Sequence, residues 1–320
     1  MSDRLAVVTG AAGFIGSHLS ERLLKDGWRV RGIDCFTSYY DPALKERNLA
    51  RLSGHPNFSL ERVDLRTVEL AALLSGAEVV WHLAAQAGVR SSWGAEFQTY
   101  TSINVNATQR ILEAARLSPP RMVVYASSSS VYGEAPVFPA AEAGPLRPIS
   151  PYGVTKLAGE HLVSLYARAY GLAACSLRYF TVYGPRQRPD MGFHKFLRAI
   201  YEQRPLPIYG DGTQTRDFTF IDDITEANLL AAERGRPGEA YNVSGGSRVQ
   251  LLEVIRTMED AAGTGAKLEF LPKQPGDPAN TGGDASLARD TLGYRPTVDL
   301  ATGLKRMAGW MREYLAGRPE

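Results

Sequence analysis

The first half of the chain alternates short apolar runs, rich in β-branched residues, with longer stretches whose apolar residues recur every three or four positions. The short runs are typical of strands buried on both faces, and the longer spacing is typical of amphipathic helices. We expect strands at residues 5–9, 29–33, 58–61, 79–82, 122–125 and 174–178. We expect helices at residues 14–26, 42–52, 68–74, 99–117 and 151–170. This alternation predicts an α/β fold with a Rossmann-type doubly wound parallel sheet.

Beyond about residue 179 the alternation gives way to segments rich in proline and glycine, such as 183–185, 205–207 and 272–277. Helical spacing returns at residues 193–203, 223–234, 251–262 and 300–315. We therefore predict a Rossmann domain at residues 1–178. Residues 179–320 are expected to form mainly a smaller C-terminal α/β lobe, with some segments returning to the first domain.

Composition and charge narrow the classes of function. The 320 residues are 44% hydrophobic and 22% charged, which is typical of a globular protein with room for a buried site. The net charge of +2 comes from interspersed acids and bases, which argues against binding to nucleic acid or a membrane surface. The apolar run at residues 5–8 is too short for a signal peptide, so we expect a cytoplasmic protein. Cys35 and Cys175 match no disulfide or metal-ligand pattern, so we expect no metal.

A glycine-rich segment, Gly-Ala-Ala-Gly-Phe-Ile-Gly at residues 10–16, begins where the first predicted strand ends. Its GxxGxxG spacing is a variant of the dinucleotide-binding fingerprint, in which bare backbone approaches a pyrophosphate at a helix N-terminus. A simple glycine turn is the alternative, but the strand before it and the helix after it favour a cofactor. Asp34 ends the second strand, where a carboxylate can bind ribose hydroxyls and would repel a 2′-phosphate. Arg31 and Lys45 have no evident position from which to offset that repulsion, so NAD is favoured over NADP.

Further cofactor contacts are expected at the carboxyl ends of the next strands, where ligands of open α/β sheets bind. Asp64 is one of these residues, and a helix N-cap is its alternative role. Together with Asp34, Tyr152 and Lys156, the predicted cofactor-binding residues are Gly10, Gly13, Phe14, Ile15, Gly16, Asp64, Leu65, Leu83, Ala84, Ala85, Ser127 and Tyr179.

Tyr152 and Lys156 are four residues apart in the predicted helix at 151–170 and follow a run of serines at 127–130. Residues at this spacing share one helix face, so the ammonium can lie close to the phenol and favour its ionised form. An unperturbed tyrosine has a pKa of about 10. Positive charge from Lys156 and a cofactor must therefore lower this pKa before Tyr152 can act as a base near neutral pH.

With these motifs in this order, nearly the whole chain resembles the extended short-chain dehydrogenase/reductases that act on nucleotide sugars. The resemblance implies NAD as cofactor, a UDP-sugar substrate, and a homodimer formed by the helices at 99–117 and 151–170. It also implies a catalytic set of Ser128, Tyr152 and Lys156. Ser128 is chosen because it stands five residues before Gly133, and its neighbours in the serine run are the alternatives.

Two later segments, residues 178–191 and 216–223, look like the nucleotide-sugar loops of this family. Within residues 82–90, 181–184, 188–191 and 274–277 the chain is similar to UDP-glucuronate 4-epimerases, which make UDP-galacturonate. By this resemblance Arg216 contacts the diphosphate, Asp277 lies near the uridine ribose, and Arg188 binds the C6 carboxylate. The full set of predicted substrate-binding residues is Arg90, Ser129, Thr181, Arg188, Gly192, Phe193, Lys195, Arg216 and Asp277.

The resemblance implies that Tyr152 takes the proton of the C4 hydroxyl while hydride passes from C4 to NAD, and that hydride then returns to the other face. The 4-keto sugar of a uronate is a β-keto acid and can lose carbon dioxide. Decarboxylases of this family carry a glutamate two positions after the catalytic hydroxyl. The 4,6-dehydratases carry an Asp-Glu pair at the two positions that follow this hydroxyl. This chain has Ser129 and Ser130, so we expect 4-epimerisation of UDP-glucuronate. The alternatives are a decarboxylase, a UDP-glucose 4-epimerase, a 4,6-dehydratase and a non-enzymatic NAD-binding regulator.

Overall fold

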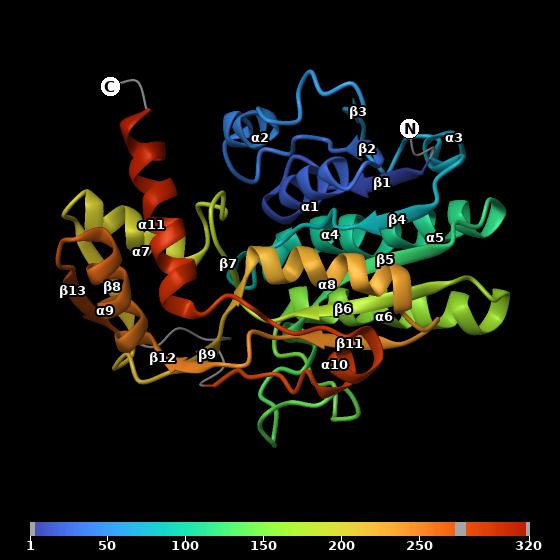
Figure 1. Cartoon of the computed structure of the whole chain (residues 1–320). Coiled ribbons are helices and arrows are strands. Elements are labelled where there is room, and N and C mark those ends of the chain that lie inside the picture. The colour runs from blue at the N-terminus through green and yellow to red at the C-terminus, as the bar shows by residue number, and fades with distance from the viewer. Residues whose placement is uncertain (1–3, 273–279, 318–320) are drawn as a thin grey trace.

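The computed structural model describes residues 4–272 and 280–317. Its centre is a seven-stranded sheet in which every strand pairs in parallel, in the order β11-β6-β5-β4-β1-β2-β3 (Figure 1). The strands are β1 (Leu5–Thr9), β2 (Arg29–Ile33), β3 (Phe58–Glu61), β4 (Val79–His82), β5 (Met122–Ser128), β6 (Ala174–Tyr179) and β11 (Ala240–Val243). The predicted Rossmann-type parallel sheet is thus confirmed, with β11 as a seventh strand that sequence analysis did not identify.

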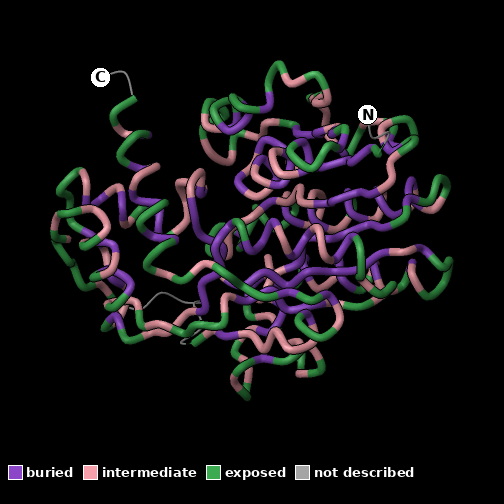
Figure 2. Tube along the Cα trace, in the orientation of Figure 1, coloured by how far each residue is buried: buried purple, intermediate pink, exposed green. Residues whose placement is uncertain are grey.

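Both faces of this sheet are covered by helices, which explains why the central strands β1, β4 and β5 are mainly apolar and almost entirely buried. Successive residues point to opposite faces: Val7 packs in the cluster that includes α5 (Ala107–Leu117) and α6 (Pro151–Tyr170). Val8 packs in the other cluster, with α1 (Phe14–Lys25) and α8 (Ile221–Arg234). Figure 2 shows the resulting buried strands running through the middle of the molecule.

The helices expected at 42–52, 68–74 and 99–117 differ most from the observed ones, and the first of them ends early, at Leu49. The helix expected at 68–74 begins later, as α3 (Leu70–Leu74), and its N-cap is Glu69, whose carboxylate accepts the Ala71 N–H at 3.2 Å. The helix expected at 99–117 is divided into α4 (Phe97–Tyr100), a π-helical segment at Thr101–Asn106, and α5. Periodicity of apolar residues does not reveal a π-helical turn, because one extra residue per turn leaves the flanking helical pattern intact.

The C-terminal part contains short strands that were not predicted. They are β7 (Val182–Tyr183), β8 (Pro205–Tyr209), β9 (Thr215–Asp217), β10 (Thr219–Phe220), β12 (Arg248–Gln250) and β13 (Lys267–Leu271). Residues 205–207, expected to be irregular, belong to β8, which forms a two-stranded parallel sheet with β13. Pro205 and Pro207 are two residues apart, so both missing N–H groups belong to one edge of β8, and the other edge keeps its donors.

The remaining helices are α2 (Pro42–Leu49), α7 (Gly192–Tyr201), α9 (Leu251–Ala262), α10 (Ser286–Leu292) and α11 (Leu300–Ala316). Helices α7, α9 and α11 gather with β8 and β13 beside the large sheet (Figure 1). From the later part of the chain, α8 and β11 join the large sheet itself. The division at residue 178 stays a prediction.

Two further findings concern the described residues as a whole. Among residues 4–272 and 280–317, no helix has the length and apolar character needed to cross a membrane. In the same residues, no cluster of three or more His, Cys, Asp or Glu side chains is placed to hold a metal ion.

The sheet also fixes where a ligand can bind. Strands β1 and β4 are neighbours, and the chain continues from β1 toward β3 on one side and from β4 toward β6 on the other. Connections leave this point on opposite faces, so a crevice forms at the carboxyl ends of β1 and β4.

Candidate active site

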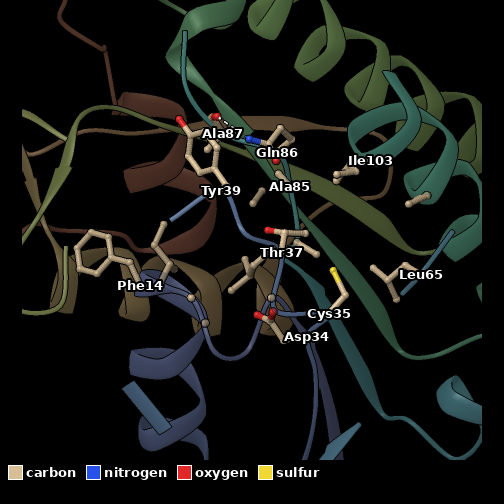
Figure 3. Close-up of a pocket in the computed structure, with 18 of the residues that line it drawn as sticks. Phe14, Asp34, Cys35, Thr37, Tyr39, Leu65, Ala85, Gln86, Ala87 and Ile103 are labelled. Carbon is tan, nitrogen blue, oxygen red and sulfur yellow. Dashed lines mark hydrogen bonds between the residues drawn. The ribbon is translucent and has the colours of Figure 1, made fainter. Parts of the chain in front are cut away.

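A cavity of about 190 Å³ lies in this crevice, and every residue predicted to contact the cofactor lines it. Figure 3 shows Phe14, Asp34, Leu65 and Ala85 around this space, contributed by four different strand-to-helix connections. Arg188 is the one predicted substrate-binding residue among those that line the cavity. The residues predicted to contact the cofactor therefore lie together at the carboxyl ends of the strands.

The glycine segment gives the cavity a floor of bare backbone. Gly10 has a positive φ of 70°, and its N–H donates to the Ile33 carbonyl at 2.7 Å. A Cβ atom on Gly16 would lie 2.1 Å from the Gly10 carbonyl oxygen, which is closer than atoms can approach. Gly13 is the N-cap of α1 and supplies no side-chain cap. The geometry fits a dinucleotide pyrophosphate held at the N-terminus of α1.

Asp34 is buried at the end of β2 and is already bonded within the protein. Its carboxylate accepts the Ala12 N–H at 3.2 Å and the Phe36 N–H at 2.8 Å. The buried Lys45 ammonium lies 2.8 Å from Asp34 Oδ1. The expectation that Lys45 has no position to offset the Asp34 charge is therefore wrong, because α2 brings the Lys45 ammonium directly to this carboxylate. Arg31 points elsewhere and donates to the Leu73 carbonyl at 2.6 Å.

Asp64 lies in the cavity wall but is not a helix N-cap, so that alternative is wrong. Its carboxylate accepts the Arg66 N–H at 2.9 Å and pairs with the Arg66 guanidinium. Hydrogen bonding to Arg66 lowers the pKa of Asp64, despite partial burial. Asp64 therefore presents an ionised carboxylate at the edge of the cavity.

The predicted catalytic pair lies at the N-terminal end of α6, whose first residue is a proline and whose N-cap Ser150 accepts the Gly153 N–H at 3.1 Å. Lys156 is buried, and its Nζ donates to the Ala126 carbonyl of β5 at 2.7 Å. Burial lowers the pKa of Lys156 from its ordinary 10.5 to about 7, while Glu160 acts to raise it.

Tyr152 does not have the lowered pKa that its spacing from Lys156 suggested. Burial raises the pKa of the Tyr152 phenol, while Arg188 and a hydrogen bond with Ser128 act to lower it. The expectation was wrong for the protein alone because the Lys156 ammonium is directed to the Ala126 carbonyl and is itself costly to keep charged. The positive charge that favours a Tyr152 phenolate has to come mainly from Arg188 and a bound cofactor.

The buried Lys156 leads to a prediction about stability and pH. An unfolded lysine keeps its ordinary pKa near 10.4, so between pH 7 and about 10.4 the unfolded chain binds more protons than the folded chain. The folded state therefore gains stability as pH rises through this window, and the cost of burying Lys156 is largest at and below pH 7. Lys156→Met in NAD-free protein should raise the melting temperature at pH 6 by roughly 5 °C and lose this advantage at pH 10. Thermal unfolding of both proteins at the two pH values measures it, and an equal difference at both would contradict the assignment.

The serine run is held in place by a hydrogen bond from Ser127 to a buried ion pair. Arg178 on β6 pairs with Glu160 on α6, with Nη2 and Oε2 2.8 Å apart, and Ser127 donates to the same carboxylate. Ser128 accepts the Ser130 N–H at 3.2 Å and contacts Ser130 Oγ at 3.1 Å. The run is thus a turn fixed on both sides, with Ser128 facing Tyr152.

Arg188 approaches Tyr152 from the segment after β7. Its Nε and Nη2 each lie 3.0 Å from an oxygen of Asp190, a bidentate pair. Burial acts to raise the pKa of Asp190, but the Arg188 guanidinium outweighs burial and the pKa is lowered. Arg188 is therefore held in one orientation in the wall of the cavity that Tyr152 also lines.

The other predicted substrate residues that the structure describes lie outside the cavity lining. Gly192, Phe193 and Lys195 belong to the first turn of α7, which begins one residue before the helical spacing predicted from residue 193. The Phe193 ring is buried against Phe218, with centroids 4.5 Å apart, so it is a core side chain and offers no surface to a nucleotide. Lys195 is exposed.

Four more residues are distributed over the neighbouring segments. Arg90 lies over the Tyr209 ring at 4.7 Å, and Arg216 lies on β9, where its Nη1 donates to the Thr215 carbonyl at 2.8 Å. Thr181 accepts the Thr219 N–H through its carbonyl, and Ser129 starts the short turn after β5. Asp277 lies outside the described residues.

Sequence analysis missed a set of residues that connect the loops around the site. Asn104, in the π-helical segment, accepts the Gln86 N–H at 2.7 Å and donates to the Gln86 carbonyl at 3.0 Å and to Thr155 Oγ1 at 3.0 Å. Tyr39 lines the cavity from the connection after β2. Asn104 could have been recognised, because it is a polar residue on the apolar side of a helical pattern. No feature of the sequence indicates that Tyr39 contacts distant segments.

Known proteins share these features. The chain matches the NAD dependent epimerase/dehydratase family over residues 6–244. It is 45% identical to an uncharacterised UDP-glucose epimerase of Bacillus subtilis, over 97% of this chain and 99% of the relative. It is 38% identical to a UDP-glucuronate 4-epimerase of Thermodesulfobacterium geofontis, over 96% of each chain.

A solved structure has the same architecture. A UDP-glucuronic acid 4-epimerase from Bacillus cereus, crystallised with UDP-glucuronic acid and NAD, matches with a TM-score of 0.94 and 43% identity. The match covers 97% of this chain and 99% of that one. These likenesses confirm the resemblance drawn from the motifs, and the chain belongs to the NAD-dependent epimerase/dehydratase family.

Proposed function

We propose that this protein interconverts UDP-glucuronate and UDP-galacturonate by NAD-dependent inversion at C4. The observation that carries the proposal is the position of Arg188, a cation beside the Tyr152 phenol in the wall of the cofactor cavity. A guanidinium at this place suits a sugar whose C6 is a carboxylate, since guanidinium and carboxylate make two parallel hydrogen bonds. The relatives from Thermodesulfobacterium geofontis and Bacillus cereus, both named for this substrate, support it.

In this proposal each residue of the chain has a defined task. When bound, NAD accepts a hydride from C4 and returns it to the opposite face of the sugar. Tyr152 accepts the C4 hydroxyl proton and gives it back, and Ser128, bonded to Tyr152, holds the C4 oxygen. Lys156, fixed to β5 through Ala126, lies beneath Tyr152 and orients the ribose next to the nicotinamide. Between the two hydride transfers the substrate is a 4-keto uronate that turns over in the pocket.

The turn at residues 128–130 supports epimerisation over elimination. The two positions after Ser128 are serines, and their neighbours in the turn are Ser128 itself and backbone groups. Eliminating water from C6 requires a carboxylic acid to protonate the leaving oxygen, and a serine hydroxyl cannot supply that proton at neutral pH. Decarboxylation needs no such acid, so it is the closest competing outcome for a 4-keto uronate.

Incubation with UDP-glucuronate and NAD, followed by chromatographic separation of the products, tests the proposal. We expect UDP-galacturonate as the main product, with no net change in NAD. A UDP-pentose or a stable 4-keto sugar as the main product would refute epimerisation. No turnover of any UDP-sugar would favour a non-enzymatic NAD-binding regulator.

UDP-glucose is a second candidate substrate, because the Bacillus subtilis relative is named a UDP-glucose epimerase. Arg188→Ala should separate the two. Loss of a charged hydrogen-bonded partner costs about 1.5–3 kcal/mol, so the KM for UDP-glucuronate should rise on the order of tenfold to a hundredfold. The KM for UDP-glucose, which has no carboxylate, should change less than about threefold. Steady-state kinetics with both sugars measure this, and equal losses would contradict a carboxylate role for Arg188.

We further propose a homodimer in the cytoplasm. Several large apolar side chains are exposed on the helices that cover one face of the sheet: Phe97 on α4, Leu117 on α5, and Val154 and Leu165 on α6. Exposed apolar residues gathered on neighbouring helices favour burial against a second copy. Sedimentation velocity distinguishes a dimer from a monomer of 34.9 kDa.

A further inference from the structure

The Arg188–Asp190 pair uses only part of the Arg188 guanidinium. Nε and Nη2 donate to the two oxygens of Asp190, both at 3.0 Å. Within residues 4–272 and 280–317, no hydrogen bond is made by Arg188 Nη1. A guanidinium has five N–H donors in one plane, so a second carboxylate can bind its other edge while Asp190 stays in place. Asp190 therefore fixes which edge of Arg188 remains available.

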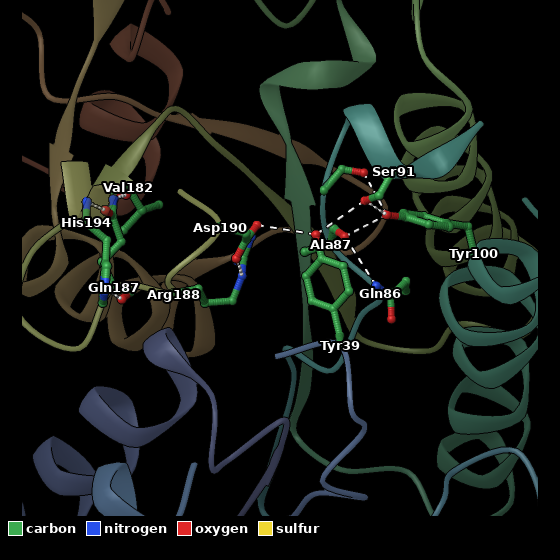
Figure 4. A network of polar contacts seen from close by, with 11 residues as sticks. Tyr39, Gln86, Ala87, Ser91, Tyr100, Val182, Gln187, Arg188, Asp190 and His194 are labelled. Atoms are coloured by element: carbon green, nitrogen blue, oxygen red, sulfur yellow. Dashed lines mark hydrogen bonds and ion pairs between the residues drawn. The ribbon is translucent and has the colours of Figure 1, made fainter. Parts of the chain in front are cut away.

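Asp190 is in turn fixed by segments from the opposite side of the site. The Tyr39 hydroxyl, from the connection after β2, donates to Asp190 Oδ2 at 3.4 Å and lies 3.3 Å from Ser91 Oγ. Ser91 Oγ lies 2.7 Å from the hydroxyl of the buried Tyr100. Figure 4 shows this series of contacts running from Asp190 to Tyr100.

The last residue of this series, Tyr100, contacts Tyr152. The Tyr100 ring meets the Tyr152 ring edge to face, with centroids 6.3 Å apart. Arg188, at the other end, is close enough to Tyr152 to influence its ionisation. The contacts thus form a ring that starts and ends at Tyr152 and includes Asp190 as the partner that orients Arg188.

We propose that Asp190 is a positioning residue that, through Arg188, holds the substrate carboxylate and prevents the 4-keto uronate from losing carbon dioxide. This inference rests on the proposed function. In the side reaction the C5–C6 bond breaks, its electron pair forms the C4–C5 double bond of an enolate, and C6 leaves as carbon dioxide. C5 then takes a proton from solvent. The step is fastest when the C5–C6 bond stands perpendicular to the carbonyl plane, because its electrons then overlap the carbonyl π system. An Arg188 held by two hydrogen bonds cannot follow the carboxylate into that geometry.

Asp190→Asn tests the role with little change of shape. Asparagine offers one acceptor oxygen where aspartate offers two, so Arg188 keeps one of its two bonds and can swing. With UDP-glucuronate and NAD, we expect the share of decarboxylated UDP-pentose products to rise about tenfold, while consumption of substrate changes less than about fivefold. Asp26→Asn is the matched control: Asp26 forms a comparable pair with Arg22 at 2.8 Å on the surface of α1, and its product ratio should equal that of wild type.

If Asp190→Asn folds poorly, a second variant still tests the role of Asp190. Tyr39→Phe removes the weaker bond to Asp190 and should raise the decarboxylated share by a smaller factor. An unchanged product ratio in either folded variant, or equal ratios for Asp190→Asn and Asp26→Asn, would overturn the role of Asp190. The wild-type reaction is run alongside, so a failure to form UDP-galacturonate is visible separately and would refute the proposed function itself.

Discussion

Tyr152→Phe should lower kcat for UDP-glucuronate by at least about 10³-fold while leaving the affinity for NAD within about twofold. General acid–base residues typically contribute 10²- to 10⁴-fold, and here the same phenol both removes and returns the proton. The phenylalanine ring keeps the contact with the Tyr100 ring, and the lost group is the hydroxyl bonded to Ser128. Steady-state kinetics and titration of NAD by fluorescence measure the two quantities.

The matched control for this change lies on the same helix. Tyr170, the last residue of α6, is largely exposed, and Tyr170→Phe should leave kcat unchanged. If Tyr152→Phe kept substantial turnover, another group would be the base, and the role assigned to Tyr152 would be wrong.

Gly16→Ala should weaken NAD binding by at least about a hundredfold. The added Cβ would lie 2.1 Å from the Gly10 carbonyl oxygen and 2.9 Å from the Ala11 Cα, and all of these are backbone atoms that cannot rotate away. The turn after β1 must then open, which moves the N-terminus of α1 away from the place where it would hold the pyrophosphate. Isothermal titration with NAD measures the loss, and thermal unfolding records the accompanying strain.

Gly309→Ala is the control that shows whether any glycine-to-alanine substitution lowers the affinity for NAD. Gly309 lies within α11, and a Cβ there would have no neighbour within 4 Å. Alanine in a helix interior is more favourable than glycine by roughly 0.5–1 kcal/mol, so this variant should be slightly more stable and bind NAD normally. Similar losses of NAD affinity in both variants would mean that close packing at Gly16 is not the cause.

The sequence allowed the Rossmann half of the fold to be predicted because its signals are local. Strands β1 to β4 have the bounds expected, and every residue of β1 and β4 is buried because helices cover both faces of the parallel sheet. In contrast, β11 becomes a strand by pairing with the edge of β6. That partner is more than sixty positions earlier in the chain, and periodicity within β11 carries no information about it.

In the candidate site, too, residues within local motifs could be predicted and long-range contacts could not. Gly16 and Asp34 could be placed from their spacing, because the motif they belong to has a known geometry. The partners of such residues could not: Lys45 reaches Asp34 through the fold of α2, and Asp190 reaches Tyr39 across 151 positions. Phe193 shows a different difficulty: it was assigned to the substrate because it lies next to a recognised motif, whereas its ring packs in the core against Phe218.

The π-helical segment at Thr101–Asn106 makes the site sensitive to the number of residues before α5. Deleting one residue there would restore regular α-helical winding. The flanking turns would keep their relative orientation, but residues inside the segment would move by one position, which is a rotation of about 100° about the helix axis. If Asn104 were among them, its carboxamide would leave Gln86 and Thr155, and the loop after β4 would lose its tie to α6. In alignments and chimeras of this family, a single-residue gap in this segment therefore signals a different position of the loop after β4, even where every predicted catalytic residue is retained.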